Sequence, residues 1–101
     1  MKGAKTMQEI FGTLPSGEIT NLYTISGGGL TAAVSDYGAT LVRLLVPDSQ
    51  GQLADVVLGY DDCNDYRQGS ACLGATVGRS ANRLKDASFC LDDRTYHLTP
   101  N

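Results

Sequence analysis

The sequence contains few of the residues that enzymes use for acid–base and metal chemistry. Its 101 residues include no tryptophan, one histidine, His97, and two glutamates, Glu9 and Glu18. A hydrolase or transferase needs titratable groups that converge on one reacting centre, and a zinc site needs several His or Cys ligands. A lone histidine within a strand is more often a surface residue than a catalyst. The sequence therefore predicts no catalytic residue and no metal site in this chain.

Cysteines and long apolar runs are also scarce. Cys63, Cys72 and Cys90 are odd in number and form no CxxC pair, which argues against a disulfide framework and against metal-ligand spacing. We expect free thiols in a reducing compartment. Two lysines lie near the start, but Glu9 interrupts before any long apolar run. Neither a secretory signal nor a membrane span is expected, and the cytoplasm is the expected location.

Positive charge is limited and scattered, which bears on the class of partner. Eleven acidic and eight basic residues give a formal net charge of −3. A nucleic-acid binder needs clustered Lys and Arg to displace counterions from phosphates, so we expect no nucleic-acid partner. Hydrophobic residues make up 42% and charged residues 19%, a composition typical of one globular domain. An uncharged ligand such as a sugar is compatible with this net charge, although the net charge alone does not identify a ligand.

Short runs with a period of two residues predict an all-β protein. Residues Leu30 to Val34 alternate as a half-buried strand does, and Thr40 to Val46 is apolar on both faces, which predicts a strand covered on both sides. Ala54 to Leu58 predicts another short buried strand, and residues 61–66 predict one helical turn capped by Asp61 or Asp62. Turn residues recur about every ten positions, as in a sandwich or barrel. These turns are Pro15-Ser16-Gly17, Gly27-Gly28-Gly29, Tyr37-Gly38 and Gly51.

The clearest local prediction is a β-hairpin near the end of the chain. Ala87 to Leu91 and Arg94 to Leu98 flank Asp92-Asp93, two residues that tolerate the backbone of a two-residue turn. This register pairs Phe89 with Tyr96 on one face.

One polar segment, residues 74–84, contains side chains suited to holding a ligand. Its sequence, GATVGRSANRL, places Arg79, Asn82 and Arg83 among apolar residues. Arginine offers five fixed donors and asparagine offers both a donor and an acceptor, so the pair can bind vicinal hydroxyls. From the residue types alone, pairing of Arg79 and Arg83 with surface aspartates is the favoured interpretation.

The same segment, however, resembles the signature of the aldose 1-epimerase family, the galactose mutarotases. The resemblance covers almost the whole chain from Gln8 onward, in order and spacing. Its further motifs are Tyr37-Gly38-Ala39-Thr40-Leu41-Val42, Pro47-Asp48, Gly51, Asp55-Val56-Val57-Leu58-Gly59-Tyr60, Phe89, Tyr96-His97-Leu98 and Asn101. The resemblance implies that residues 1–101 are the N-terminal part of one large antiparallel β-sandwich, the mutarotase-like supersandwich, incomplete at its C-terminal side. It also implies that the protein needs no metal and no organic cofactor.

The resemblance further implies a substrate and a division of roles. Asn82 and Arg83 match the family's Asn-Arg pair, which binds hydroxyls of a free aldose such as galactose or glucose, and Arg79 receives a structural role. In the family a glutamate removes the anomeric proton and a histidine protonates the ring oxygen, so that the ring opens and recloses as either anomer. These two groups, and a substrate-binding histidine in a Leu-His-Gly-Gly segment, follow the position of Asn101, and His97 is none of them. We expect this chain alone to be inactive.

Two alternatives remain open at this point. The first is a non-catalytic β-sandwich module that binds carbohydrate or another protein. Because open sheet edges recruit strands, the remainder of an epimerase chain or a second copy is an expected partner in either case. The second alternative is a related branch that acts on sugar phosphates, although the G-R-x-A-N-R form favours free sugars.

Overall fold

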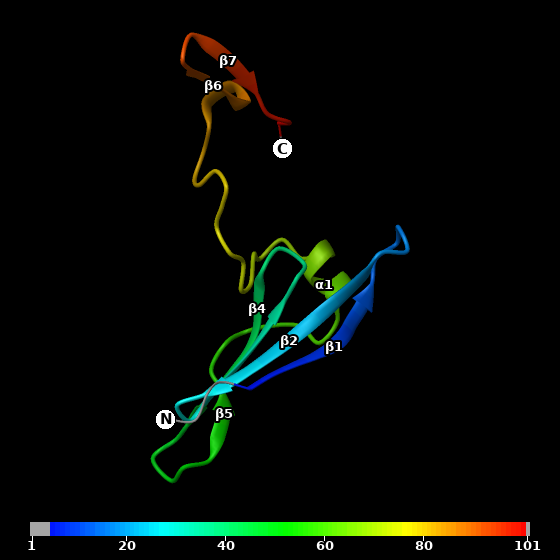
Figure 1. The fold of residues 1–101 in the computed structure, drawn as a ribbon, viewed down its shortest axis with the longest axis vertical. Coiled ribbons are helices and arrows are strands. Elements are labelled where there is room, and N and C mark those ends of the chain that lie inside the picture. Colours follow the sequence, from blue (N-terminus) through cyan, green and yellow to red (C-terminus); the bar gives the residue numbers. More distant parts are fainter. Residues whose placement is uncertain (1–4, 101) are drawn as a thin grey trace.

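The computed structural model describes residues 5–100, which form an antiparallel β fold with one short helix (Figure 1). Asn101, which the family resemblance includes, and residues 1–4 lie outside the described residues. The elements are β1 (Lys5–Thr13), β2 (Ile19–Gly27), β3 (Leu30–Ser35), β4 (Thr40–Pro47), β5 (Leu53–Asp55), α1 (Cys63–Gln68), a 3₁₀ turn (Lys85–Ala87), β6 (Ser88–Leu91) and β7 (Arg94–His97). Strands β1 to β5 form one sheet in the order of the chain, and β6 pairs with β7 separately.

Glycines with positive φ make the turns of this meander, as the sequence predicted. Gly28 and Gly29, with φ of 59° and 81°, connect β2 to β3, and Gly38, with φ of 67°, lies between β3 and β4. Glycine adopts these values without the clash that a Cβ atom would cause. The predicted strands Leu30 to Val34 and Thr40 to Val46 are confirmed as β3 and β4.

The predicted strand over residues 54–58 is wrong in extent and in burial. Strand β5 covers only Leu53–Asp55, and all three residues are exposed. The Asp55 Oδ1 atom accepts hydrogen bonds from the backbone N–H groups of Leu44, at 3.1 Å, and Val57, at 3.2 Å. The Val56 N–H still donates to the Leu44 carbonyl at 3.0 Å, but the Asp55 carboxylate takes the Leu44 N–H in place of a backbone carbonyl, so the pairing with β4 ends there.

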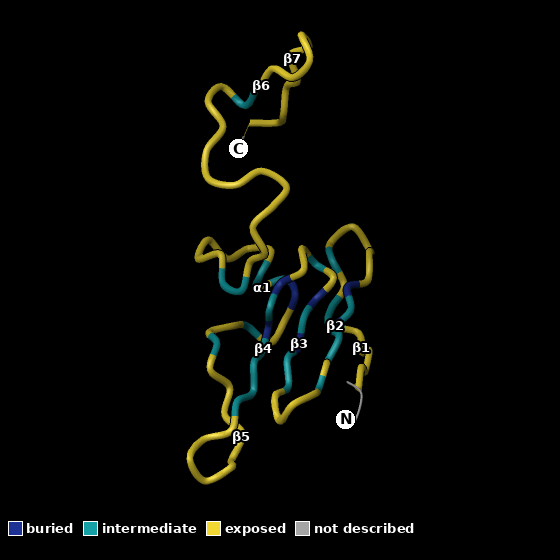
Figure 2. The backbone as a smooth tube through the Cα atoms, turned by 60° about the vertical axis from the view of Figure 1, so that its left-hand side comes forward, coloured by how far each residue is buried: buried dark blue, intermediate teal, exposed yellow. Residues whose placement is uncertain are grey.

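The buried residues of the sheet lie near α1 (Figure 2), and their side chains form one hydrophobic cluster. Leu22, Ala33 and Val42, from β2, β3 and β4, are each no more than 3% exposed. Phe11 from β1 and Tyr66 from α1 pack against them, with their ring centroids 6.0 Å apart. The alternation of side chains along each strand thus concentrates the buried residues on one face of the sheet.

Helix α1 is fixed to the β1 end of the sheet by its first turn. Asp62 is the N-cap, and its Oδ1 accepts a hydrogen bond of 2.7 Å from the Asn64 N–H, which confirms the predicted capped turn. Cys63 is fully buried against Gly12, where an added Cβ atom would lie 3.0 Å from the Cys63 Cβ. The Asn64 Nδ2 group donates to the Thr13 carbonyl at 3.0 Å. The helix approaches the sheet this closely because position 12 has no side chain.

The opposite face of the sheet is only partly covered within residues 5–100. Tyr23, Val34 and Leu41 pair side by side across β2, β3 and β4 and are half-buried, while Ile25 is 42% exposed. The expectation that both faces of Thr40 to Val46 are covered is therefore not met by the described residues. Helix α1 and the core residues cover one face of the sheet, and no helix or strand of the described residues packs on the face that carries Tyr23, Val34 and Leu41.

Hairpin β6–β7 stands apart from the sheet at the end of an extended segment (Figure 1). Its turn residues Asp92 and Asp93 have φ values of 49° and 62°, the left-handed pair that a two-residue type I′ turn requires. Phe89 pairs with Tyr96, and their rings stack with centroids 5.3 Å apart. The predicted hairpin and its register are confirmed.

Candidate functional site

The segment that carries the predicted site begins where the chain last touches the sheet. Gly74 has φ of 62°, and its carbonyl accepts a hydrogen bond of 2.9 Å from the Leu41 N–H of β4. Two residues later, the Thr76 hydroxyl donates to the Ala39 carbonyl at 2.6 Å. These two contacts set the direction in which the chain leaves the sheet towards Asn82.

Asn82 and Arg83 come together in one hollow of about 840 Å³. Asn82 has φ of 61°, a left-handed conformation that asparagine tolerates better than most residues. Its neighbours in the lining are Ser80, Leu84, Lys85, Ala87, Leu98, Thr99 and Pro100. Both residues that the sequence predicted for substrate binding, which are neighbours in the chain, line this hollow.

The hairpin supplies the second wall of this hollow. The Leu98 N–H donates to the Ala87 carbonyl at 2.7 Å, which extends the β6–β7 pairing by one step and brings Leu98 and Pro100 to the hollow. The sequence interpretation did not assign these residues to the site, although its hairpin register already placed Leu98 opposite Ala87. Lys85 was also missed, because no motif singled it out.

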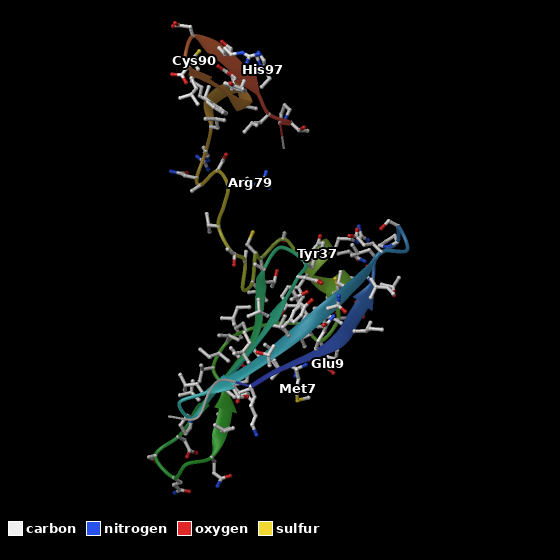
Figure 3. All side chains as sticks on the ribbon, viewed as in Figure 1. Met7, Glu9, Tyr37, Arg79, Cys90 and His97 are labelled. Atoms are coloured by element: carbon white, nitrogen blue, oxygen red, sulfur yellow. The ribbon has the colours of Figure 1, made fainter. Side chains whose placement is uncertain are left out.

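Arg79 and His97 do not join the hollow. Figure 3 shows Arg79 on the extended segment between the sheet and the hairpin, and His97 on β7 at the far end. His97 pairs with Ser88 across the hairpin, and neither Arg79 nor His97 is part of the lining. His97 therefore belongs to the strand, as the sequence interpretation held.

The described lining combines hydrogen-bonding groups with apolar surface. Arg83 and Lys85 provide donors and positive charge, Asn82 provides a donor and an acceptor, and the hydroxyls of Ser80 and Thr99 provide both. Leucine, alanine and proline side chains make up the rest. Such a mixture suits a ligand with several hydroxyl groups and an apolar ring face.

The carboxylate of Asp36 has a lowered pKa and lies away from the hollow. Hydrogen bonds from the Asn21 backbone N–H, at 2.8 Å, and the Asn21 side-chain amide, at 3.0 Å, lower the pKa of Asp36 below its usual 3.8. Asp36 lies in the β3–β4 turn and not in the lining of the hollow.

Within residues 5–100 no three His, Cys, Asp or Glu side chains lie in a group that could hold a metal ion. No helix among these residues is long and apolar enough to cross a membrane.

Comparison with known proteins identifies relatives along nearly the whole chain. The family model described as aldose 1-epimerase matches residues 21–101. A probable aldose 1-epimerase of Arthroderma benhamiae is 40% identical over 84 residues, which are 79% of this chain and 19% of that protein. The galactose mutarotase of Homo sapiens is 36% identical over 99 residues, 97% of this chain and 29% of that protein. The chain thus spans between 19% and 29% of the length of these two curated relatives.

Two solved structures share the fold. Galactose 1-epimerase from Lactobacillus acidophilus NCFM superposes with a TM-score of 0.69 at 25% identity, over 98% of this chain and 28% of that one. The GalM/aldose epimerase homologue from C. elegans gives a TM-score of 0.62 at 33% identity, over 98% of this chain and 26% of that one. The predicted fold class, an antiparallel β-sandwich of the galactose epimerase type, is confirmed.

Fold and hollow together describe an all-β protein with a partly polar hollow at the foot of a hairpin. The chain belongs to the aldose 1-epimerase family.

Proposed function

We propose that this chain is the N-terminal part of an enzyme that interconverts the α and β anomers of a free aldose such as galactose or glucose. In this proposal Asn82 and Arg83 bind the hydroxyls of the sugar. The observation that carries it is their meeting in one hollow with the hydroxyls of Ser80 and Thr99. Arginine and asparagine can bind adjacent hydroxyls because their donors and acceptors have fixed spacing.

The role of these residues in the reaction is positioning. Mutarotation requires a base at the anomeric hydroxyl and an acid at the ring oxygen, and the family resemblance places both beyond this segment. Asn82 and Arg83 would hold the pyranose in one orientation, so that base and acid meet the correct atoms. We propose that the 101-residue chain on its own therefore binds part of the sugar and does not accelerate the reaction.

The exposed surface supports the proposal that residues 1–101 are part of a larger sandwich. The chain exposes 8069 Å², whereas a compact monomer of 10.7 kDa exposes about 5500 Å². Its radius of gyration is 17.6 Å, against about 13 Å for a compact chain of this length. We propose that the remainder of the epimerase chain, or a second copy, covers the open sheet face and edges. The three free cysteines are compatible with the cytoplasm as the proposed location.

A polarimetric assay of Arg83→Ala tests the proposed sugar contact. In the full-length protein that contains this segment, loss of charged hydrogen bonds worth about 1.5–3 kcal/mol lowers kcat/KM for galactose mutarotation about 10- to 150-fold. The control is Arg94→Ala, which removes an exposed arginine at the start of β7, outside the hollow. Equal activity of the two variants contradicts the binding role of Arg83. Acceleration of mutarotation by the purified 101-residue chain contradicts the proposed division of roles.

A further inference from the structure

A second cleft, of about 390 Å³, lies between the β3–β4 turn, helix α1 and the loop that follows the helix. It shares no residue with the hollow of Asn82 and Arg83. The side chains that carry its chemistry are Tyr37, Thr40, Tyr60, Tyr66, Cys72 and Thr76. Its volume falls in the range of about 300–1,000 Å³ that is usual for small-molecule sites.

The walls of this cleft are held in place by hydrogen bonds. The Thr40 hydroxyl donates to the Tyr37 carbonyl at 2.7 Å, and the Thr76 hydroxyl donates to the Ala39 carbonyl at 2.6 Å. The Tyr66 hydroxyl accepts from the Tyr60 N–H at 2.9 Å. The rings of Tyr60 and Tyr66 also meet edge to face, with centroids 5.1 Å apart. The cleft is therefore formed before any ligand binds.

A glycine keeps one wall open. An added Cβ atom at Gly69 would lie 3.2 Å from two atoms of the Tyr60 ring system and 2.9 Å from the Asp65 carbonyl oxygen. Gly69 also donates its N–H to that carbonyl at 2.8 Å, which ends α1 at the edge of the cleft. A larger residue at this position would require the Tyr60 ring or the end of α1 to shift.

The lining specifies the chemistry of a ligand. It includes no charged side chain, so a ligand charge would lose hydration without gaining a counter-charge. The hydroxyl protons of Thr40 and Thr76 are already donated, which leaves their oxygens as acceptors, whereas the Tyr66 hydroxyl accepts a bond and still has a proton to donate. Each of these groups thus has one partner within the chain and capacity for a further hydrogen bond, which hydroxyl groups on a ligand would use and a purely apolar cover would not.

We propose that this cleft is a second monosaccharide subsite, which binds one uncharged pyranose ring against the tyrosine side chains. The inference rests on the proposed function only in taking sugar as the class of ligand. The subsite would extend recognition from one sugar to a second sugar unit or a second sugar molecule.

Alkylation of Cys72 in the full 101-residue chain tests the subsite. Cys72 is exposed and lines the cleft, Cys90 is exposed on the hairpin, and Cys63 is buried. The probe is methyl β-galactoside, which cannot mutarotate because its anomeric oxygen is methylated. At five times its dissociation constant the probe slows iodoacetamide labelling of Cys72 about sixfold, and leaves Cys90 unchanged. The matched galactosiduronate, with a carboxylate at C6, protects Cys72 less.

Two variants assign the protection to the cleft. Ala75→Leu places extra side-chain atoms in the lining and abolishes protection, whereas Ala71→Leu, in the same loop but outside the lining, retains it. If the glycoside shifts the NMR signals of Asn82 and Arg83 but leaves Cys72 unprotected, the subsite is refuted and the proposed function survives. If Cys72 is protected and those signals do not move, the subsite stands and the role of Asn82 and Arg83 fails. Failure of Cys72 to react without ligand shows a closed cleft and overturns the inference.

Discussion

Replacing Gly74 by alanine should destabilise the sheet at the point where the site segment leaves it. Gly74 has φ of 62°, and an added Cβ atom would collide with the backbone carbonyl of Leu41 on β4. The same residue accepts the hydrogen bond from the Leu41 N–H at 2.9 Å. Alanine at this position therefore both adopts an unfavourable backbone conformation and pushes the segment away from its partner strand.

The free energy of folding that Gly74→Ala should cost has two separable contributions. A non-glycine residue in the left-handed region costs about 1–2 kcal/mol of folding free energy. The collision, relieved by movement that weakens the Leu41 hydrogen bond, adds about 1–3 kcal/mol. Gly28 isolates the first contribution, since its φ is 59° and nothing lies within 4 Å of an added Cβ atom. We expect Gly28→Ala to cost about 1–2 kcal/mol and Gly74→Ala about 2–5 kcal/mol.

Urea unfolding followed by circular dichroism measures both variants. A lower midpoint at constant m-value reports a change in stability without a change in the surface exposed on unfolding. If Gly74→Ala loses no more free energy than Gly28→Ala, the close approach of Gly74 to β4 does not stabilise the fold. The account of how the sheet holds the site segment would then be wrong.

Two further substitutions test local features of the sheet and helix. Asp36→Asn removes the carboxylate that accepts hydrogen bonds from Asn21. Because folding lowers the pKa of Asp36, the ionised carboxylate stabilises the folded chain above about pH 4. This stabilisation is lost as the pH falls through the pKa of Asp36 in the folded state. The difference between the urea midpoints of the variant and the original chain should therefore be full at pH 7 and shrink as the pH is lowered below about 4; a constant difference would exclude this ionisation as the cause. Asp62→Ala removes the helix cap to Asn64 and should cost about 1 kcal/mol, while Asp61→Ala, which leaves this cap bond intact, should cost less in the same measurement.

Local features of the fold could be predicted from the sequence where neighbouring residues determine the backbone. The turn at Asp92 and Asp93 is one case, because these residues tolerate the left-handed conformation and the alternation on each side fixes the register. The early end of β5 could not be predicted in this way. It depends on the Asp55 carboxylate reaching Leu44, eleven positions earlier, and only the paired strands bring these residues together.

The candidate site, like the fold, could be predicted from the sequence only in part. Asn82 and Arg83 were identified through a family motif, since their residue types alone favoured surface ion pairs. Their meeting with Leu98 and Pro100 depends on the hairpin folding back to the 3₁₀ turn, and no short motif encodes that contact. Whether these two residues bind sugar stays a prediction until the Arg83 variant is measured.

The meander order of the sheet also determines when each part of the molecule can form during synthesis. Every strand from β2 to β5 pairs with the strand made just before it. A hairpin closes in about 1–10 μs, whereas a ribosome adds about 5–20 residues per second. Each strand can therefore pair as soon as it is free of the ribosome, before the next is complete. Since the hollow needs Leu98 to Pro100 in addition to Asn82 and Arg83, the candidate site is completed only after the sheet that precedes it in the chain.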